Sequence, residues 1–185
     1  MADVAPMLER LGPLAAHQAI SVTQLGPAAR FSFRGGEAAT TALGKAFGCV
    51  PRHEACRAAV DRDRAALWLG PDEWLLIAPE SETASLFATL GEALIGEPHS
   101  LVDISHRNVG FDIMGEAAPA VLNAGCPLDF DPETFPTGMC TRTVLAKAEV
   151  VLWRLSTHRF RLEAWRSFAP YVLAFLTQAA ENEER

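Results

Sequence analysis

Two stretches of this sequence repeat each other at a spacing of 80 residues, and this repeat constrains the fold more than any other feature. The run Arg30-Phe-Ser-Phe-Arg-Gly-Gly-Glu-Ala-Ala matches Gly110-Phe-Asp-Ile-Met-Gly-Glu-Ala-Ala-Pro, and Gly35 aligns with Gly115. Because apolar and polar residues alternate in both runs, each is expected to form a half-buried strand that ends at a glycine turn. Such a repeat predicts two copies of one structural unit.

A helix is expected after each of these strands. Both segments end at a Gly-Cys pair, Gly48-Cys49 and Gly125-Cys126. A glycine just after the last apolar position favours a left-handed C-terminal cap, because it has no Cβ to clash. The apolar residues recur at helical spacing, at Ala39, Leu43, Ala46 and Phe47 in the first copy and at Ala118, Val121 and Leu122 in the second.

The second part of each copy is expected to form a β-hairpin. Runs that begin at Leu67 and Leu152 repeat at an offset of 85 in the first strand, which aligns Trp68 with Trp153, and of 86 in the returning strand. In each run four turn-like residues separate two strands rich in large apolar side chains. We interpret the repeated tryptophans as packing residues, with an aromatic ligand cage as the alternative.

An amphipathic helix is predicted to close each copy. Ser81 and Ser167 are the predicted N-caps, because a hydroxyl accepts a hydrogen bond from an unpaired amide of the first turn. Pro170 then falls in the first turn, where its missing N–H costs little. The apolar faces consist of Leu86, Phe87, Leu90 and Leu94 in the first helix and of Phe168, Tyr171, Val172, Phe175 and Leu176 in the second.

Both copies therefore share the order strand, strand, helix, hairpin, helix, over about 20–95 and 100–180. This order predicts an α+β fold in which two pseudo-symmetric halves pack their sheets and helices around a shared core. We expect residues 1–185 to form a single domain built from the two internal repeats.

Composition excludes several classes of protein. The chain has 185 residues, of which 49% are hydrophobic and 21% charged, so it buries enough apolar surface to offset the entropy of folding. A net charge of −7 lacks the basic field of a nucleic-acid binder. No apolar run is long enough for a membrane span, and the N-terminus lacks the pattern of a signal peptide. The four cysteines are expected to be thiols in a reducing cytoplasm.

Two clusters of reactive side chains are candidates for chemistry. Cys49, His53 and Cys56 have the spacing of metal ligands, but a zinc site needs four ligands and no fourth is evident, so ordinary polar side chains are favoured.

The run Asp103-Ile-Ser-His-Arg follows a predicted strand, where adjacent residues point to opposite faces. We therefore favour an Asp and an Arg that fix a turn over a catalytic triad. Glycine-rich phosphate-binding motifs are absent from the sequence.

Much of the positive charge lies in the second repeat, which includes Arg142, Arg154, Arg161 and Arg166. In an acidic chain this stretch either meets an anionic ligand or acidic partner or forms a solvated sheet face. If it faces a partner, replacing Arg154 and Arg161 by Glu weakens assembly. The fold is then expected to change by at most about 1 kcal/mol for each exposed charge.

Six stretches in chain order carry a further resemblance: Gly12-Pro-Leu-Ala, Leu69-Gly-Pro-Asp-Glu-Trp-Leu-Leu-Ile, Val102-Asp-Ile-Ser-His-Arg, Gly125-Cys-Pro-Leu-Asp, Cys140-Thr-Arg-Thr-Val-Leu-Ala-Lys-Ala-Glu-Val and Arg166-Ser-Phe-Ala-Pro-Tyr. Together they resemble the gamma subunit of heterotetrameric sarcosine oxidase. The resemblance covers nearly the whole chain, and the combination is far more specific than any single stretch. Residues 52–64 depart from the pattern, which leaves the Cys/His cluster without family support.

The resemblance implies a fold like the folate-binding domain of aminomethyltransferases, and Asp103-Ile-Ser-His with Gly115 resembles their Asp-x-Ser…Gly pattern. It also implies a complex with alpha, beta and delta subunits that oxidatively demethylates sarcosine to glycine, forming hydrogen peroxide and methylene-tetrahydrofolate. FAD, FMN, NAD and folate are implied in the alpha and beta subunits and zinc in the delta subunit, with none bound by this chain.

We therefore predict a non-catalytic structural subunit of a cytoplasmic sarcosine oxidase complex, with a folate-binding module of the aminomethyltransferase-like fold as the alternative. No catalytic or metal-binding residue is predicted, and neither nucleic acid nor a membrane is an expected partner. The candidate interface residues are Trp74, Asp103, His106, Arg107, Arg142, Arg154, Arg161 and Arg166.

Overall fold

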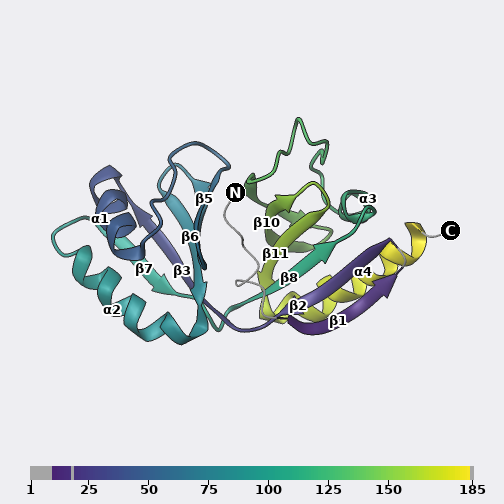
Figure 1. Cartoon of the computed structure of the whole chain (residues 1–185), viewed down its shortest axis with the longest axis horizontal. Coiled ribbons are helices and arrows are strands. Elements are labelled where there is room, and N and C mark those ends of the chain that lie inside the picture. Colours follow the sequence, from purple (N-terminus) through teal and green to yellow (C-terminus); the bar gives the residue numbers. More distant parts are fainter. Residues whose placement is uncertain (1–9, 18, 184–185) are drawn as a thin grey trace. The chain divides into compact units, whose positions relative to one another are not determined.

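The computed structural model describes residues 10–17 and 19–183 of the chain, whose helices and strands are shown in Figure 1. Contacts divide these residues into two compact units. The first unit is Pro27–His106, and the second combines residues 10–26 with residues 107–183. No helix in the described part of the chain is long and apolar enough to cross a membrane.

The first unit is a five-stranded antiparallel sheet with the strand order β4-β5-β6-β3-β7. Helices α1 and α2 pack against one face of this sheet, where Phe31, Leu43 and Leu86 belong to one buried cluster (Figure 1). The elements are β3 (Ala28–Gly35), α1 (Glu37–Phe47), β4 (Ala58–Asp61), β5 (Arg64–Gly70), β6 (Glu73–Pro79), η2 (Glu80–Glu82), α2 (Thr83–Ala93) and β7 (His99–Asp103).

The second unit is a six-stranded antiparallel sheet with the strand order β1-β2-β8-β11-β10-β9. Helices α3 and α4 supply Val121, Val172 and Leu176 to its buried cluster. The elements are β1 (Arg10–His17), β2 (Ile20–Leu25), β8 (Asn108–Met114), α3 (Ala118–Asn123), β9 (Cys140–Leu145), β10 (Ala148–Ser156), β11 (Arg159–Trp165), η3 (Arg166–Phe168) and α4 (Ala169–Glu183).

The two sheets confirm the predicted α+β fold with pseudo-symmetric halves. The order β7-β3-β6-β5-β4 in one sheet corresponds to β2-β8-β11-β10-β9 in the other. Phe31 pairs with Leu76 in the first sheet, and Phe111 pairs with Leu162 in the second, so the register repeats as well as the order.

The predicted alignment of the first hairpin strands is wrong by one residue. Trp68 pairs with Trp74 in the first hairpin, and Arg154 pairs with Phe160 in the second, so one offset of 86 relates both strands. A slip of one residue exchanges the two faces of a strand. The structural counterpart of Trp68 is therefore Arg154, and not Trp153.

Each compact unit combines strands from both repeats. Strand β2 opens the first repeat but pairs with β8, while β7 opens the second repeat and pairs with β3. The repeats thus exchange their first strands, which the contiguous ranges 20–95 and 100–180 do not anticipate. The organisation of the whole chain as a single domain stays a prediction.

The glycines that end the first helix of each repeat differ. Gly48 ends α1 with a φ of 78°, and its N–H donates to the carbonyl of Gly44 at 3.0 Å, which confirms the left-handed cap. At the end of α3 the capping residue is Ala124 with a φ of −59°, so the left-handed cap predicted at Gly125 is wrong. A Cβ on Gly125 would overlap the ring of Phe175, so glycine permits close packing there instead.

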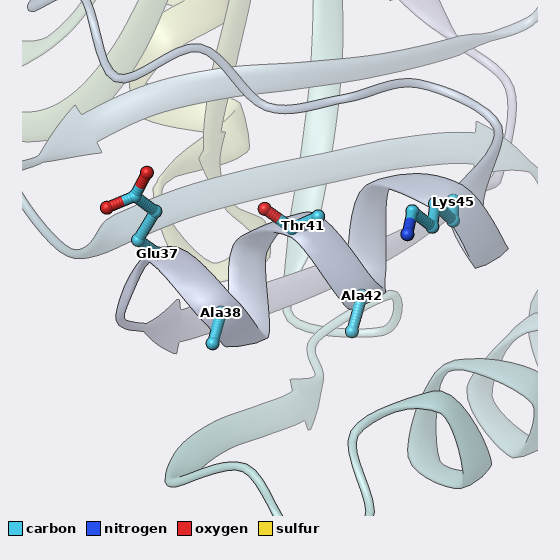
Figure 2. A pocket seen from close by; sticks show the side chains of 5 residues that line it. All are labelled: Glu37, Ala38, Thr41, Ala42 and Lys45. Atoms are coloured by element: carbon cyan, nitrogen blue, oxygen red, sulfur yellow. The ribbon is translucent and has the colours of Figure 1, made fainter.

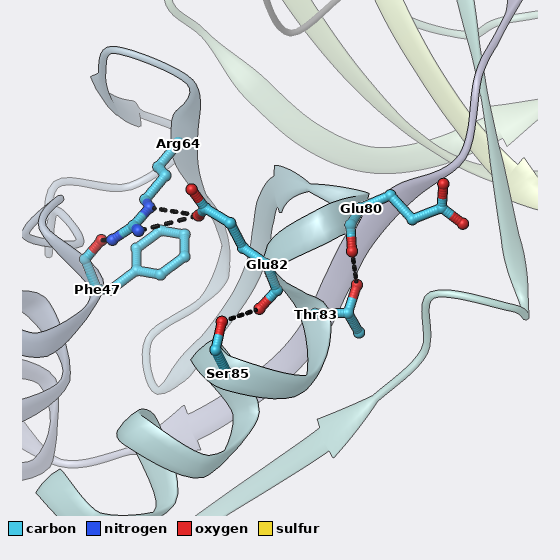
Figure 3. Close-up of polar contacts among 6 residues, drawn as sticks. All are labelled: Phe47, Arg64, Glu80, Glu82, Thr83 and Ser85. Atoms are coloured by element: carbon cyan, nitrogen blue, oxygen red, sulfur yellow. Dashed lines mark hydrogen bonds and ion pairs between the residues drawn. The ribbon is translucent and has the colours of Figure 1, made fainter.

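The predicted N-caps are also wrong, because a 3-10 turn precedes each closing helix. Ser81 lies inside η2 and Ser167 inside η3, and no side chain caps α2. The hydroxyl of Thr83 instead donates to the carbonyl of Glu80 at 2.7 Å (Figure 3). Pro170 does lie in the first turn of α4, as predicted.

Arg64 connects three elements of the first unit (Figure 3). From β5, its Nη1 donates to the carbonyl of Phe47 at 2.6 Å, and its Nε and Nη2 donate to Oε2 of Glu82 at 3.1 and 2.9 Å. The guanidinium also lies 5.7 Å from the centre of the Phe47 ring. These contacts join the end of α1 to the start of α2.

Candidate interaction site

Asp103 holds the turn that follows β7. Its Oδ1 accepts hydrogen bonds from the N–H and the hydroxyl of Ser105, at 2.9 and 2.6 Å. Ser105 Oγ in turn accepts the N–H of Arg30 at 2.9 Å, which ties the turn to β3. The interpretation of this Asp as a turn residue is therefore confirmed. Arg107 donates from Nε to Oδ1 of the adjacent Asn108 at 3.2 Å.

The three residues of the Cys/His cluster, Cys49, His53 and Cys56, are not gathered around one position in the structure. Residues 49–56 include no helix, so the shared helical face on which a metal site would depend is not formed. Burial raises the pKa of the Cys49 thiol to about 11, which keeps it protonated. His53 is exposed, and its ring meets Trp74 edge-on with ring centres 5.3 Å apart. Within the described ranges no three His, Cys, Asp or Glu side chains gather around a metal position.

Arg154 is buried, with 1% of its surface exposed, so its selection as an interface residue is wrong. Its Nη1 donates to the carbonyls of Phe130 and Phe135 at 3.0 and 2.6 Å, and its Nη2 donates to that of Thr157 at 2.7 Å. The guanidinium lies 5.0 Å from the centre of the Phe160 ring. Burial lowers the pKa of this guanidinium, against the opposing effect of Asp131. Arg154 therefore anchors the loop between α3 and β9.

Trp74 and Arg161 are buried as well and are not available to a partner as exposed side chains. Trp74 is fully buried, and its Nε1–H donates to the carbonyl of Arg52 at 2.9 Å, which confirms its role in packing. Arg161 and Glu163 are each 1% exposed and form an ion pair with 2.7 Å between Nη2 and Oε1. The expectation that charge reversal at Arg154 and Arg161 leaves the fold intact is therefore wrong, because it would bury unpaired charge.

Three exposed aromatic residues follow one another closely in the sequence between the end of β11 and the first turn of α4. Trp165 is 43% exposed, and Phe168 and Tyr171 are each 37% exposed. The guanidinium of Arg107 lies 5.4 Å from the centre of the Trp165 ring, and the N–H of Arg166 donates to the carbonyl of Arg107 at 2.7 Å. Phe168 and Tyr171 meet edge to face with ring centres 6.5 Å apart. We call these five residues the Trp165 patch.

The sequence pattern placed Phe168 and Tyr171 on the buried face of the closing helix, which is wrong. Phe168 lies in η3, before α4 begins, so the helical period does not apply to it. Tyr171 lies next to Val172, which is fully buried, and turns away from the core. The signal that could have revealed the site is the closeness of arginine and aromatic residues, because interface cores are enriched in both.

The Trp165 patch offers binding chemistry. Its aromatic rings present large rigid surfaces, and a guanidinium stacked on tryptophan keeps donors free for a partner's carbonyl or carboxylate groups. Trp, Tyr and Arg are also the residues that most often dominate the energy of protein interfaces. The patch is therefore suited to holding a partner.

The structure brings two of the predicted candidates, Arg107 and Arg166, together in this patch. Three others are exposed elsewhere: Asp103 and His106 belong to the first unit, and Arg142 lies on β9 with its Nε 3.9 Å from Oε1 of Glu149.

A shallow depression of about 600 Å³ lies along the exposed side of α1 (Figure 2). Its lining has one carboxylate, one ammonium group and no aromatic ring, so it offers no surface on which a pterin ring could stack. The alternative of a folate-binding module gains no support from this depression. The lining residues are Glu37, Ala38, Thr41, Ala42 and Lys45.

Comparison with protein families identifies relatives of the whole arrangement. A model of the sarcosine oxidase, gamma subunit family matches residues 35–182. Sarcosine oxidase subunit gamma from Corynebacterium sp. (strain P-1) is 36% identical over 145 residues, which cover 78% of this chain and 70% of that protein. Sarcosine oxidase subunit gamma from Arthrobacter sp is 40% identical over 120 residues, which cover 64% of this chain and 58% of that protein.

Two solved structures are similar over most of the chain. A chain of heterotetrameric sarcosine oxidase from Corynebacterium sp. U-96, solved in complex with pyrrole 2-carboxylate, superimposes with a TM-score of 0.84 and 30% identity, covering 97% of this chain and 91% of that one. Aminomethyltransferase T of the glycine cleavage system from Bartonella henselae superimposes with a TM-score of 0.64 and 14% identity, covering 85% and 45%. The latter likeness concerns the fold alone and confirms the predicted aminomethyltransferase-like fold.

Proposed function

The chain belongs to the sarcosine oxidase, gamma subunit family, and we propose that it serves as a non-catalytic structural subunit of a heterotetrameric sarcosine oxidase. The observation that carries this proposal is the likeness to a chain of such an enzyme over 97% of the present chain. That likeness extends over both compact units of the chain.

The complex would oxidise sarcosine with dioxygen in the presence of tetrahydrofolate. The N-methyl carbon passes to tetrahydrofolate as a methylene group, glycine is released, and dioxygen is reduced to hydrogen peroxide. We assign FAD, FMN, NAD, folate and zinc to the partner subunits, named alpha, beta and delta in this family. The present chain would contribute surface and shape to this assembly.

We further propose a cytoplasmic location for this complex. The four cysteines all lie in the described part of the chain and form no disulfide there, and Cys49, Cys126 and Cys140 are buried. Burial raises the pKa of Cys49 and of Cys126, so these two thiols stay protonated and unreactive at neutral pH. Free thiols of this kind are typical of proteins in a reducing compartment.

The Trp165 patch is the proposed contact with a partner subunit. Trp165 is 43% exposed, although its position at the end of a buried strand would allow a polar residue at no cost to the core. The guanidinium of Arg107 lies 5.4 Å from the centre of the indole ring, and this contact favours one arrangement of the two exposed side chains by about 0.5–1 kcal/mol. The patch thereby combines an aromatic anchor with a favoured geometry.

The first experiment asks whether the chain resides in an active oxidase. A tagged full-length chain is expressed in its own cells grown on sarcosine and recovered by affinity purification. We expect the recovered fraction to show flavin absorbance and to form hydrogen peroxide when sarcosine is added. A chain recovered without either property would contradict the proposal.

A second experiment tests the patch within the same assembly. The substitution Trp165→Ser is expected to weaken complex formation by about 10-fold or more, which is the effect of losing an interface residue worth at least 1.4 kcal/mol. Phe87→Ser is the matched control, since Phe87 is 41% exposed on α2 of the other unit. Equal effects of the two substitutions would place the interface outside the patch.

A further inference from the structure

Strand β7 (His99–Asp103) forms one edge of the five-stranded sheet. It pairs with β3 from Phe31↔Asp103 to Gly35↔His99 without any shift in register, and it occupies the last position in the strand order. Its outer edge therefore has no second strand within the described residues. Val102 is 50% exposed on this strand, and four of the five residues of β7 are exposed.

Two hydrogen bonds identify which backbone groups of β7 point away from the sheet. Ile104 N–H donates to the carbonyl of Arg30 at 2.9 Å, so even-numbered residues of β7 bond to β3. Gly35 N–H donates to the carbonyl of Asp72 at 3.1 Å, so the odd-numbered residues of β3 bond on the side away from β7. This agrees with the alternation of backbone groups along a strand. The N–H and carbonyl groups of His99, Leu101 and Asp103 consequently face outward.

The pseudo-symmetry of the fold indicates what belongs at this edge. The counterpart of β7 in the six-stranded sheet is β2, which lies beside β8 as β7 lies beside β3. The outer edge of β2 is covered by β1, which pairs with it antiparallel from Arg10↔Leu25 to His17↔Ile20. The position outside β7 is thus the one place where the two sheets differ in strand order.

The composition of β7 supports the same conclusion. Lysine, proline and β-bulges are among the devices by which natural proteins protect exposed sheet edges, and β7 with the sequence His-Ser-Leu-Val-Asp has none of these three within its bounds, although it ends in a charged residue, Asp103. The outward N–H and carbonyl groups of β7 have the spacing of a β-ladder. The exposed side chain of Val102 could pack against an apolar side chain of an added strand.

From these observations we propose that β7 accepts an extended segment of a partner subunit, which adds a sixth strand to this sheet. The inference rests on the proposed function, because a hetero-complex supplies a chain other than a second copy of this one. The added strand would occupy the place that β1 holds in the other sheet, and its backbone would bond to Leu101 and Asp103. An apolar residue of the segment would cover Val102.

Hydrogen exchange resolved at single amides tests the proposal on the intact complex and on the isolated full chain. In the isolated chain the amides of Leu101 and Asp103 exchange rapidly, while those of Ser100 and Val102 are protected by β3. In the complex we expect exchange at Leu101 and Asp103 to slow by about 100-fold or more, with Ser100 and Val102 protected in both states. The alternation within one strand is the internal control.

Each other outcome overturns the inference in a distinct way. If a complex forms and the two outward amides exchange equally fast in both states, no strand is added to β7. If they are protected already in the dilute isolated chain, a segment of this chain covers the edge, and protection that grows with its concentration indicates a second copy. If no complex forms at all, the proposed function itself is wrong.

Matched substitutions on two sheet edges provide a second test. The substitution Val102→Lys places a charge at the proposed contact, and Val144→Lys places one on β9, an edge of the other sheet where Val144 is 43% exposed. We expect Val102→Lys to weaken complex formation by about 10-fold and Val144→Lys to change it by less than about 2-fold. Equal effects would contradict the proposal.

Discussion

Replacing Arg154 by methionine tests how the fold depends on a buried cation. The guanidinium donates three short hydrogen bonds of 2.6–3.0 Å to the carbonyls of Phe130, Phe135 and Thr157, and a longer one of 3.3 Å from Nε to the carbonyl of Ser156. Hydrogen bonds from a charged donor contribute about 1.5–3 kcal/mol each, and the carbonyls would lose their donors in the variant. The guanidinium no longer has to be buried, which offsets part of this loss.

We therefore expect Arg154→Met to lower the free energy of unfolding by roughly 3–5 kcal/mol, because the lost hydrogen bonds outweigh the relief from no longer burying a cation. For a chain of this size such a loss corresponds to a Tm lower by about 10 °C. Arg154→Lys keeps the charge, but one ammonium group does not reach all of these carbonyls, so a smaller loss of about 2 kcal/mol is expected. Denaturant unfolding of the purified chain measures both values.

Arg166→Met is the control, because Arg166 is exposed and its side chain has no hydrogen bond to any residue of the ranges 10–17 and 19–183. We expect it to change the free energy of unfolding by less than about 0.5 kcal/mol. The reasoning is refuted if Arg154→Met also costs less than about 1 kcal/mol, since the buried hydrogen bonds would then contribute nothing beyond a surface residue.

Two further predictions concern the backbone and a buried thiol. Gly115→Ala is expected to cost roughly 1–3 kcal/mol in thermal unfolding, because φ is +142° and the added Cβ would meet the Ala19 carbonyl, whereas Gly36→Ala finds open space and costs at most about 1 kcal/mol, the effect of losing the N-cap glycine of α1. Cys49 has its pKa raised to about 11, so the unfolded chain loses this proton before the folded one does. Stability should therefore fall as pH rises from about 9 towards about 11, and Cys49→Ala should remove that part of the slope.

The correspondence between the two sheets, though not the pairing of strands within each, follows from the sequence repeat for a physical reason. Strand pairs are held by side chains that repeat every second residue, so a repeat that aligns Phe31 with Phe111 also aligns their partners Leu76 and Leu162. In the hairpins Trp68 and Trp153 match in residue type. The structural counterpart of Trp68 is the next residue, Arg154. The turn geometry, with the same bulge in both hairpins, decides that register.

The exchange of strands β2 and β7 could not be predicted from the sequence. Each strand has the same local pattern whether it pairs within its own repeat or with the other repeat, and only long-range contacts distinguish the two arrangements.

The burial of Arg154 was missed for a related reason. Its partners are backbone carbonyls, which leave no signal in a side-chain pattern, and an arginine is by default assigned to the surface.

The Trp165 patch was anticipated only in its charged members. Arg107 and Arg166 stood among the candidates because of their charge, whereas Phe168 and Tyr171 were assigned to the core by their helical spacing. The 3-10 turn η3 shifts the start of α4 and so moves both aromatic side chains to the surface. A short irregular turn thus converts an expected core face into a candidate interface.

Native mass spectrometry of the complex purified from its own cells tests the central claim most directly. The account predicts one assembly that contains a single copy of this 20.0 kDa chain together with three different chains, and that releases flavin on denaturation. Collision-induced dissociation should release the 20.0 kDa chain intact and without any bound cofactor mass. A chain found only as a free monomer or as a homo-oligomer would contradict the account.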